Sequence, residues 1–359
     1  MRLIRQPLDA LALQWRELLL RVHTINNKAY RLPNELTEFQ LRLYVHVIDW
    51  KWNHLTKGAG EFRGRLYDAL LPAEFVADHH PLYPPIVARF LEHQKKFPFK
   101  SHKFFGHMAS SQAACANLFL PLLQQPDIAA RILSTVKGDL KQIATDRLDC
   151  GYRIEFWDEP DNMLGDHNKT SGTDSDIAIA YYDHKHEPNL WLIEHKLTEK
   201  EFTTCGGHRS RGRTKEHNCQ STKDLLAQPS LCYYQSACGY HYWDITLSNA
   251  DAFSSDNFSR HADCPFKGGT NQLWRNYLLA LAIENSQSSK WPYRKVFFSV
   301  VYHPRNQALK PTLASFQAIV GNNDRFFHFP SSALVQAAKT IDDTSVAEWV
   351  SWYEELYYF

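Results

Sequence analysis

GTDSDIAIAYY at residues 172–182 and LWLIEHK at residues 190–196 are the two stretches that decide the fold of this chain. Residues 177–182 and 190–196 are rich in β-branched and aromatic side chains, which favour extended strands. The connector 183–189 is polar and contains turn-forming residues, so we expect the two strands to pair as an antiparallel hairpin. The first strand is apolar on both faces, as is typical of a strand in the centre of a sheet.

Three charged residues of this hairpin are predicted to meet at one point. Side chains alternate along a strand, so Glu194 and Lys196 share one face and lie roughly 6–7 Å apart. Asp176 stands at the start of the neighbouring strand and can reach the same point. Asp176 and Glu194 are predicted to hold a hard divalent cation, with the carbonyl of His195 as a further ligand. Lys196 is predicted to orient water, to deprotonate it if burial beside the metal lowers the lysine pKa, or to neutralise the transition state.

An ordinary solvated face is the alternative interpretation of a Glu-x-Lys pair on a strand. Here the pair directly follows the apolar residues 191–193, which indicate a buried strand. Charges on a buried strand are costly unless they are paired or bound to a metal. Asp176 upstream completes the set, so we favour the catalytic interpretation.

The order of these motifs resembles the PD-(D/E)xK nuclease superfamily, which has the restriction-endonuclease-like fold. EHKLTEKEF at 194–202, SSQAACANLF at 110–119 and QLWRN at 272–276 are similar to segments of a cysteine-containing group of bacterial restriction endonucleases. The resemblance implies an α/β core with a mixed central sheet flanked by helices, a Mg²⁺ or Mn²⁺ ion, and DNA as substrate. Ser175 stands where the superfamily pattern has proline, so Asp174 remains an alternative for the first carboxylate.

The superfamily pattern also implies a third acidic residue. Glu155, within YRIEF at 152–156, is the candidate, and an exposed strand residue is the alternative. On the predicted helix 110–123, Asn117 is expected to serve helix packing. Gln112 does not share one narrow face of the helix with Asn117. Its role is left as either a contact in the core or a contact with DNA.

Five of the seven cysteines follow the second strand within the loop-rich segment 203–268. Their spacings are long and include no CxxC pair, so spacing alone does not define a zinc site. Some nucleases of the superfamily carry iron–sulfur clusters, so the resemblance favours a [4Fe–4S] cluster, with Zn²⁺ as the alternative. The predicted ligands are Cys205, Cys219, Cys232 and Cys264, with Cys238, His208 or His217 as substitutes. The other interpretation is a set of buried thiols without a ligand.

Basic residues in the same segment are candidate DNA contacts, since Arg and Lys bind phosphates along a duplex. The cluster contains Arg209, Arg211, Arg213 and Lys215. Arg275 of the QLWRN motif is a further candidate, with an internal ion pair as its alternative role.

The composition is that of a globular protein with 359 residues, 44% of them hydrophobic, and a net charge of only +1. Any attraction to nucleic acid must therefore come from a local patch. No apolar run is long enough for a membrane span and no signal peptide is evident, so a cytoplasmic protein is expected. We expect a helical N-terminal region, residues 1–105, and a nuclease-like core, residues 106–359, with segment 203–268 as a cysteine-rich insertion.

The leading functional hypothesis is a metal-dependent deoxyribonuclease, an endonuclease of a restriction system or antiviral defence. One alternative is a DNA-binding protein on a nuclease scaffold with a structural zinc or iron–sulfur site. Another is an RNA-processing nuclease, because the metal chemistry is the same. The expected partners are DNA and a second copy of the chain, because one-site nucleases often cut both strands as two-fold pairs.

Overall fold

The computed structural model describes residues 20–359, except 169–170, 209–220, 255–257, 259–260 and 322. The chain forms two compact units. Unit 1 combines Met1–Pro121 with Ala338–Phe359, and unit 2 is Leu122–Ala337. Neither division falls at the predicted boundary after residue 105.

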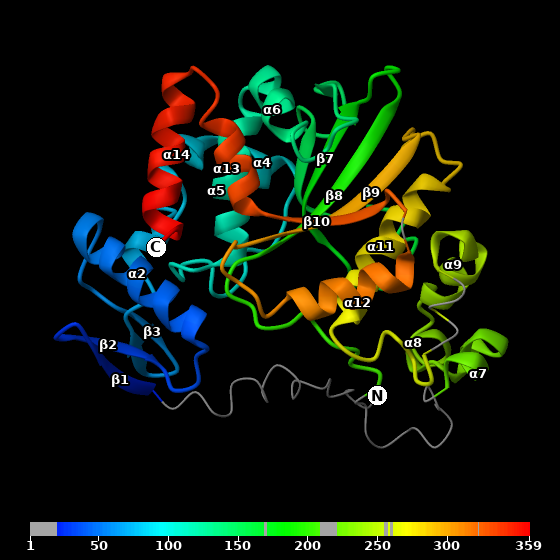
Figure 1. The fold of residues 1–359 in the computed structure, drawn as a ribbon, viewed down its shortest axis with the longest axis horizontal. Helices are drawn as coiled ribbons and strands as arrows, with labels where there is room; N and C mark the ends of the chain where they lie inside the picture. The colour runs from blue at the N-terminus through cyan, green and yellow to red at the C-terminus, as the bar shows by residue number, and fades with distance from the viewer. Residues whose placement is uncertain (1–19, 169–170, 209–220, 255–257, 259–260, 322) are drawn as a thin grey trace. The chain divides into compact units, whose positions relative to one another are not determined.

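A mixed six-stranded sheet forms the centre of unit 2 (Figure 1). The strands run in the order β10-β9-β8-β7-β5, and β6 also pairs with β7. Strands β5, β6 and β8 are antiparallel to β7, whereas β8, β9 and β10 are parallel to one another. The strands are β5 (Gln142–Ile143), β6 (Tyr152–Phe156), β7 (Ser175–Tyr182), β8 (Pro188–Lys196), β9 (Lys295–Tyr302) and β10 (Phe326–Pro330). The predicted hairpin and the mixed central sheet are therefore confirmed.

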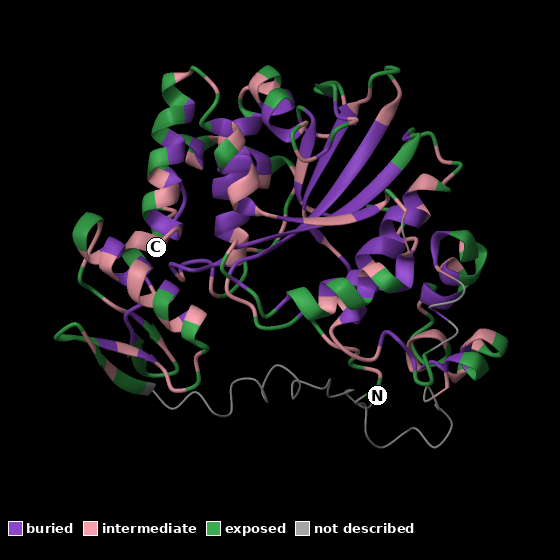
Figure 2. Ribbon diagram, viewed as in Figure 1, coloured by how far each residue is buried: buried purple, intermediate pink, exposed green. Residues whose placement is uncertain are grey.

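The central strands are apolar because both of their faces are covered. Figure 2 shows β7, β8 and β9 buried along most of their length. Ile177 pairs with Ile193 in the antiparallel ladder, and Glu194 stands opposite Val300 in the parallel one. This register brings the end of β8 beside the start of β7.

Helix α11 (Thr270–Glu284) packs on the sheet and is buried over most of its surface. Its apolar side chains share one hydrophobic core with the sheet residues Leu190, Leu192, Phe298 and Val300. Trp274 lies flat on Phe266, with ring centroids 4.1 Å apart. The other helices of unit 2 are α6 (Pro126–Leu133), α7 (Thr222–Ala227), η2 (Pro229–Leu231), α8 (Tyr233–Ser236), α9 (Tyr242–Ser248), η3 (Ala250–Ala252), α12 (Lys310–Val320) and α13 (Ser331–Ala338).

Unit 1 is only partly helical, which corrects the prediction for residues 1–105. It contains two antiparallel hairpins, β1–β2 (Leu20–Ile25, Lys28–Pro33) and β3–β4 (Gly60–Phe62, Arg65–Tyr67). Asn26 and Asn27 make the first turn with positive φ angles, a conformation that asparagine tolerates. The helices are α2 (Glu38–His54), α3 (Ala73–Ala77), η1 (Pro84–Ile86), α4 (Val87–Lys96), α5 (Ser111–Leu123) and α14 (Thr344–Tyr357).

Asn117 serves packing within unit 1, as predicted. Its side chain is fully buried in α5. The amide oxygen accepts a hydrogen bond from the backbone N–H of Tyr83, and the amide nitrogen donates to Pro81 O and to the hydroxyl of Tyr357.

Across the residues that the structure describes, no helix has both the length and the apolar character needed to cross a bilayer.

Candidate active site

The ends of β7 and β8 bring Asp176, Glu194 and Lys196 together. The Lys196 ammonium lies 2.9 Å from Glu194 Oε1, so the two side chains share one face as strand alternation requires. Both residues are buried, with 8% and 4% of their surface exposed. The backbone N–H of His195 donates to Asp176 Oδ2 at 2.6 Å. The predicted convergence is therefore present, while the catalytic roles stay predictions.

The position of Asp176 follows from the way the ladder ends. The last backbone pair that joins β7 to β8 at this end is Ile177 with Ile193. One residue further, the Asp176 carboxylate accepts the N–H of His195 in place of a backbone carbonyl. The side chain thus continues the ladder and is fixed beside the Glu194 position.

Helix α11 holds the Glu194 carboxylate with two amides. Gln272 Nε2 donates to Oε1 at 2.8 Å, and Asn276 Nδ2 donates to Oε2 at 3.0 Å. The two residues lie one turn apart on the helix and so project from one side. Gln272 Oε1 accepts the backbone N–H of Thr203, which fixes the orientation of this amide. Neither amide was predicted from the sequence to have a role. Their four-residue spacing within QLWRN, which places both on one side of a helix, was the available signal.

The electrostatics of the site favour neutral Asp176 and charged Lys196. Burial, followed by the carboxylates of Glu194 and Glu155, raises the pKa of Asp176 well above its usual range, against the opposing effect of Lys196. Burial alone lowers the pKa of Lys196, but Glu194, Glu199 and Asp176 together raise it above its ordinary value. For the protein groups alone the net direction is therefore upward, and a lowering of the lysine pKa by burial beside a bound metal stays a prediction.

Glu155 lies across from Asp176 on β6. It falls between the pairs Ile154 with Ile177 and Phe156 with Ser175. Its φ angle is +48°, which is uncommon for a residue with a side chain and is often found at functional sites. Its carboxylate is one of the charges that raise the pKa of Asp176. This position suits the predicted third acid.

The donor set fits a Mg²⁺ or Mn²⁺ ion. Among the described residues, no three His, Cys, Asp or Glu side chains are grouped to hold a metal ion on their own. Mg²⁺ does not need such a group, because proteins commonly bind it through one or two carboxylates, with waters and substrate phosphates as the other ligands. Asp176 and Glu194 supply two carboxylates, and each carboxylate has lone pairs beyond those used by its hydrogen bonds.

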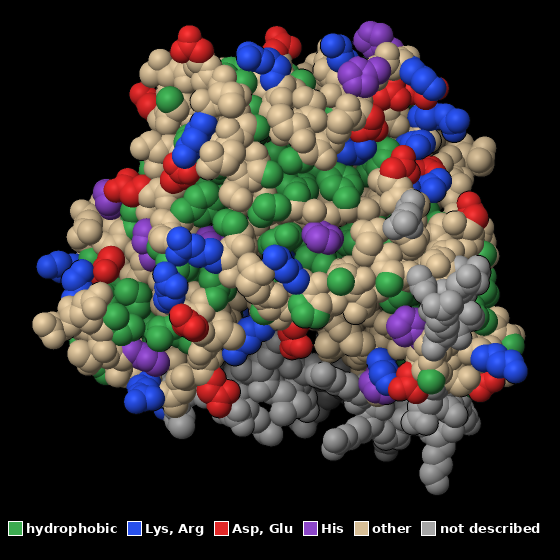
Figure 3. Space-filling view, in the orientation of Figure 1, with side chains coloured by type: hydrophobic (Ala, Val, Ile, Leu, Met, Phe, Trp, Pro, Cys, Tyr) green, Lys and Arg blue, Asp and Glu red, His purple; other side chains and the backbone are tan. Residues whose placement is uncertain are grey.

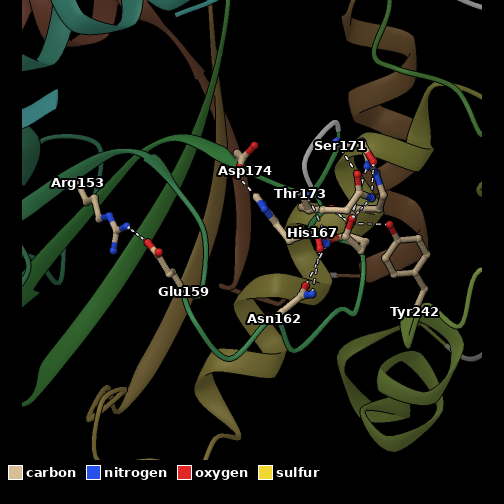
Figure 4. Close-up of polar contacts among 11 residues, drawn as sticks. Arg153, Glu159, Asn162, His167, Ser171, Thr173, Asp174 and Tyr242 are labelled. Carbon is tan, nitrogen blue, oxygen red and sulfur yellow. Dashed lines mark hydrogen bonds and ion pairs between the residues drawn. The ribbon is translucent and has the colours of Figure 1, made fainter. Parts of the chain in front are cut away.

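Asp174, the alternative first carboxylate, is held by another partner. Figure 4 shows Asp174 and His167 directed toward each other, and Asp174 Oδ1 lies 2.7 Å from His167 Nε2. The His167 ring stacks on Trp157 with centroids 3.9 Å apart. The geometry therefore favours Asp176 over Asp174 as the first acid.

Arg275 lies within an internal polar cluster. Asp166 is almost fully buried and accepts hydrogen bonds from Thr173 and from the hydroxyl of Tyr242, the latter at 2.7 Å (Figure 4). Arg275 Nη1 lies 4.0 Å from the same Asp166 oxygen that Tyr242 contacts. This arrangement supports the alternative role of Arg275 as an internal ion pair, and a DNA contact stays a prediction.

The remaining predicted site residues are only partly covered by the structure. Arg209, Arg211, Arg213, Lys215, Cys219 and His217 lie outside the described residues. Cys232 and Cys264 are buried in the hydrophobic core beside α11, and Cys205 Sγ accepts the backbone N–H of His208. The described cysteines thus form no group fitted to a metal or cluster. Gln112 belongs to unit 1, where its side chain accepts the backbone N–H of His102.

A mixed sheet that presents Asp, Glu and Lys at the ends of two adjacent strands is the arrangement that the resemblance to restriction-endonuclease-like nucleases implies. A family model described as Restriction Endonuclease associating with ARP matches residues 42–358, and the chain belongs to this family. The resemblance inferred from the motifs is therefore confirmed. No curated protein and no solved structure matches the chain.

Proposed function

We propose that this protein is a metal-dependent deoxyribonuclease that hydrolyses phosphodiester bonds of foreign DNA in a restriction or antiviral defence system. The observation that supports this proposal is the convergence of Asp176, Glu194 and Lys196 at the ends of β7 and β8. Membership of a restriction endonuclease family supports DNA as the substrate. A buried Lys beside two acids is costly to maintain, and phosphoryl chemistry gives it a use.

Asp176 and Glu194 would hold a Mg²⁺ or Mn²⁺ ion. A divalent ion in such a site stabilises negative charge on phosphoryl oxygens and favours the deprotonation of water. His195 fixes Asp176 through its N–H, while Gln272 and Asn276 fix Glu194. The protein thus orients both carboxylates before substrate arrives.

Lys196 acts in this proposal as a fixed positive charge. Against the effect of burial, the carboxylates of Glu194, Glu199 and Asp176 raise its pKa, which favours the ammonium form as a hydrogen-bond donor. The ammonium group, held by Glu194, would orient the attacking water or neutralise charge on the scissile phosphate. Of the roles predicted from the sequence, the proposal uses these two, and deprotonation of water by the lysine stays an alternative.

Cleavage of supercoiled plasmid by the purified chain tests the proposal. We expect nicked or linear product with Mg²⁺ or Mn²⁺ and none with EDTA. Tight binding without any cutting would support the alternative of a DNA-binding protein on a nuclease scaffold. Cutting of RNA but not DNA would support the RNA-processing alternative. Light scattering of the DNA complex tests the predicted homodimer.

A cofactor at the cysteines stays a separate proposal. The described cysteines give it no geometric support, and Cys219 lies outside the described residues. A [4Fe–4S] cluster would give the anaerobically purified protein visible absorption and bound iron, whereas Zn²⁺ would give bound metal without colour. Protein with neither metal has only free thiols in this segment.

The two amides of α11 are expected to affect catalysis through Glu194. Combined Gln272→Ala and Asn276→Ala substitutions should lower cleavage about 10- to 100-fold, as is usual when partners of a metal ligand are removed. The Mg²⁺ concentration for half-maximal rate should rise, because Glu194 loses its fixed orientation. Titrating Mg²⁺ in the plasmid assay measures both effects.

Asn285→Ala is the matched control, because Asn285 is an exposed amide at the end of the same helix. An unchanged Mg²⁺ dependence in the double variant would contradict the positioning role. Circular dichroism of the variants confirms that both remain folded.

A further inference from the structure

A lysine-rich segment without acidic residues begins in the last turn of helix α4 in unit 1. The sequence from His93 to Gln125 contains no Asp or Glu. Within it, Lys95, Lys96, Lys100 and Lys103 are all exposed. The whole chain, by contrast, balances 40 basic against 39 acidic residues, and Figure 3 shows both signs distributed over the visible face. This segment is therefore a local concentration of positive charge.

The phenylalanines between the lysines attach this segment to unit 1. Phe99 packs edge-on against Phe90 of α4 at 5.7 Å, and Phe97 packs against the ring of His93 at 5.3 Å. Phe104 packs edge-on against Phe62 of the β3–β4 hairpin at 5.0 Å. The rings pack on their neighbours and are half-buried, while the intervening lysines are exposed to solvent.

Hydrogen bonds hold the backbone of the same segment, residues 95–104, which we call the lysine loop. Gln94 Nε2 donates to Phe99 O and to Ser101 Oγ. From α5, Gln112 Oε1 accepts the N–H of His102 at 2.8 Å. The lysine loop is therefore a shaped surface, and fixed groups lose less conformational entropy when a ligand binds.

The β3–β4 hairpin extends the basic surface. Arg63 lies over the ring of Phe62, and Lys103 lies over the ring of Phe104. Contact between these two rings joins the hairpin to the lysine loop, so both cations belong to one region of unit 1. Arg65 on the hairpin is also exposed. The acids near it in sequence are Glu61 and Glu92, both exposed, and Asp68, which is buried and paired with Arg31. The surface therefore retains a net positive charge.

We propose that the lysine loop, together with Arg63, binds the phosphate backbone of duplex DNA. The inference takes the identity of the polyanion from the proposed nuclease function and is otherwise independent of cleavage. Aromatic side chains that stack on single-stranded bases must offer a free ring face, whereas Phe62 and Phe104 contact each other and lie beneath the cations of Arg63 and Lys103. Exposed lysines act as point charges and suit sequence-independent phosphate contacts.

The test is duplex binding by the full chain in EDTA, measured by fluorescence anisotropy over a range of KCl concentrations. Combined Lys95→Gln, Lys100→Gln and Lys103→Gln substitutions should weaken binding on the order of ten- to a hundred-fold and reduce the salt slope by about 2 to 3, since each phosphate contact contributes about 0.9. Gln112→Ala keeps every charge, so a smaller loss with an unchanged slope is expected.

Combined Lys141→Gln, Lys185→Gln and Lys290→Gln substitutions are the control, because they remove three exposed lysines of unit 2. Equal effects of the two triple variants, or none from the first, would overturn the proposal. Loop-dependent binding of RNA but not DNA would overturn the assignment of the partner.

These experiments can refute the DNA-binding role of the lysine loop and the proposed nuclease function independently of each other. Loop-dependent binding by a protein that never cuts would leave this inference standing and refute the proposed function. Cleavage by a protein whose triple loop variant binds normally would do the reverse.

Discussion

Replacing Lys196 with alanine is expected to lower plasmid cleavage on the order of a hundred- to a thousand-fold, the usual effect of removing a group that stabilises transition-state charge. The same change should destabilise the fold by about 3–5 kcal/mol, because it leaves the buried Glu194 without its cation. Initial cleavage rates and urea unfolding in EDTA measure the two effects.

A double substitution separates these two roles of Lys196. Glu194→Gln combined with Lys196→Ala removes both charges and should recover much of the lost stability without restoring cleavage. Lys200→Ala is the matched control, because Lys200 is exposed just beyond the strand. Cleavage at the wild-type rate by Lys196→Ala would refute the catalytic assignment.

Asp176→Asn is expected to abolish metal-dependent cleavage and to raise the thermal midpoint of the metal-free protein. Because its pKa is raised, Asp176 binds its proton more tightly in the folded protein than in the unfolded one. This favourable contribution to stability is fully present below the pKa of the unfolded state and is lost as the pH rises through the pKa of the folded state. The Asp176→Asn variant is neutral at every pH, so it escapes this loss, and its amide oxygen can still accept the N–H of His195. The gain should be absent near pH 4, about the ordinary pKa of Asp, and should increase as the pH is raised above it.

Calorimetry in EDTA across this pH range measures the stability difference, and the plasmid assay measures activity. Asp174→Asn is the control, because Asp174 is paired with His167 and the substitution should leave cleavage nearly unchanged. Loss of cleavage in Asp174→Asn together with its retention in Asp176→Asn would show that the first carboxylate had been assigned to the wrong residue.

The central sheet was predictable because its strands are defined by local sequence. The hairpin of β7 and β8 was predicted within two residues at each end. A strand covered on both faces needs a continuous apolar run, which few other structures produce. The meeting of Glu194 with Lys196 followed from alternation along one strand.

The contacts that depend on tertiary packing could not be predicted in the same way. Gln272 and Asn276 reach Glu194 only because α11 lies on that face of the sheet. The direction of the Lys196 pKa shift depends on the sum of three carboxylates against burial, which no spacing specifies. In unit 1, the pair Asn26 and Asn27 was the turn signal for a hairpin that helical periodicity obscured.

The Gln272 side chain joins the acidic centre to the start of the cysteine-rich segment. Its nitrogen faces Glu194 and its oxygen faces the backbone of Thr203. A shift of residue 203 would leave this amide free to rotate, and the rotated group would turn a repelling oxygen toward the carboxylate. A change in the chain just after Phe202 would therefore alter the hydrogen bonding of Glu194 through the side-chain amide of Gln272.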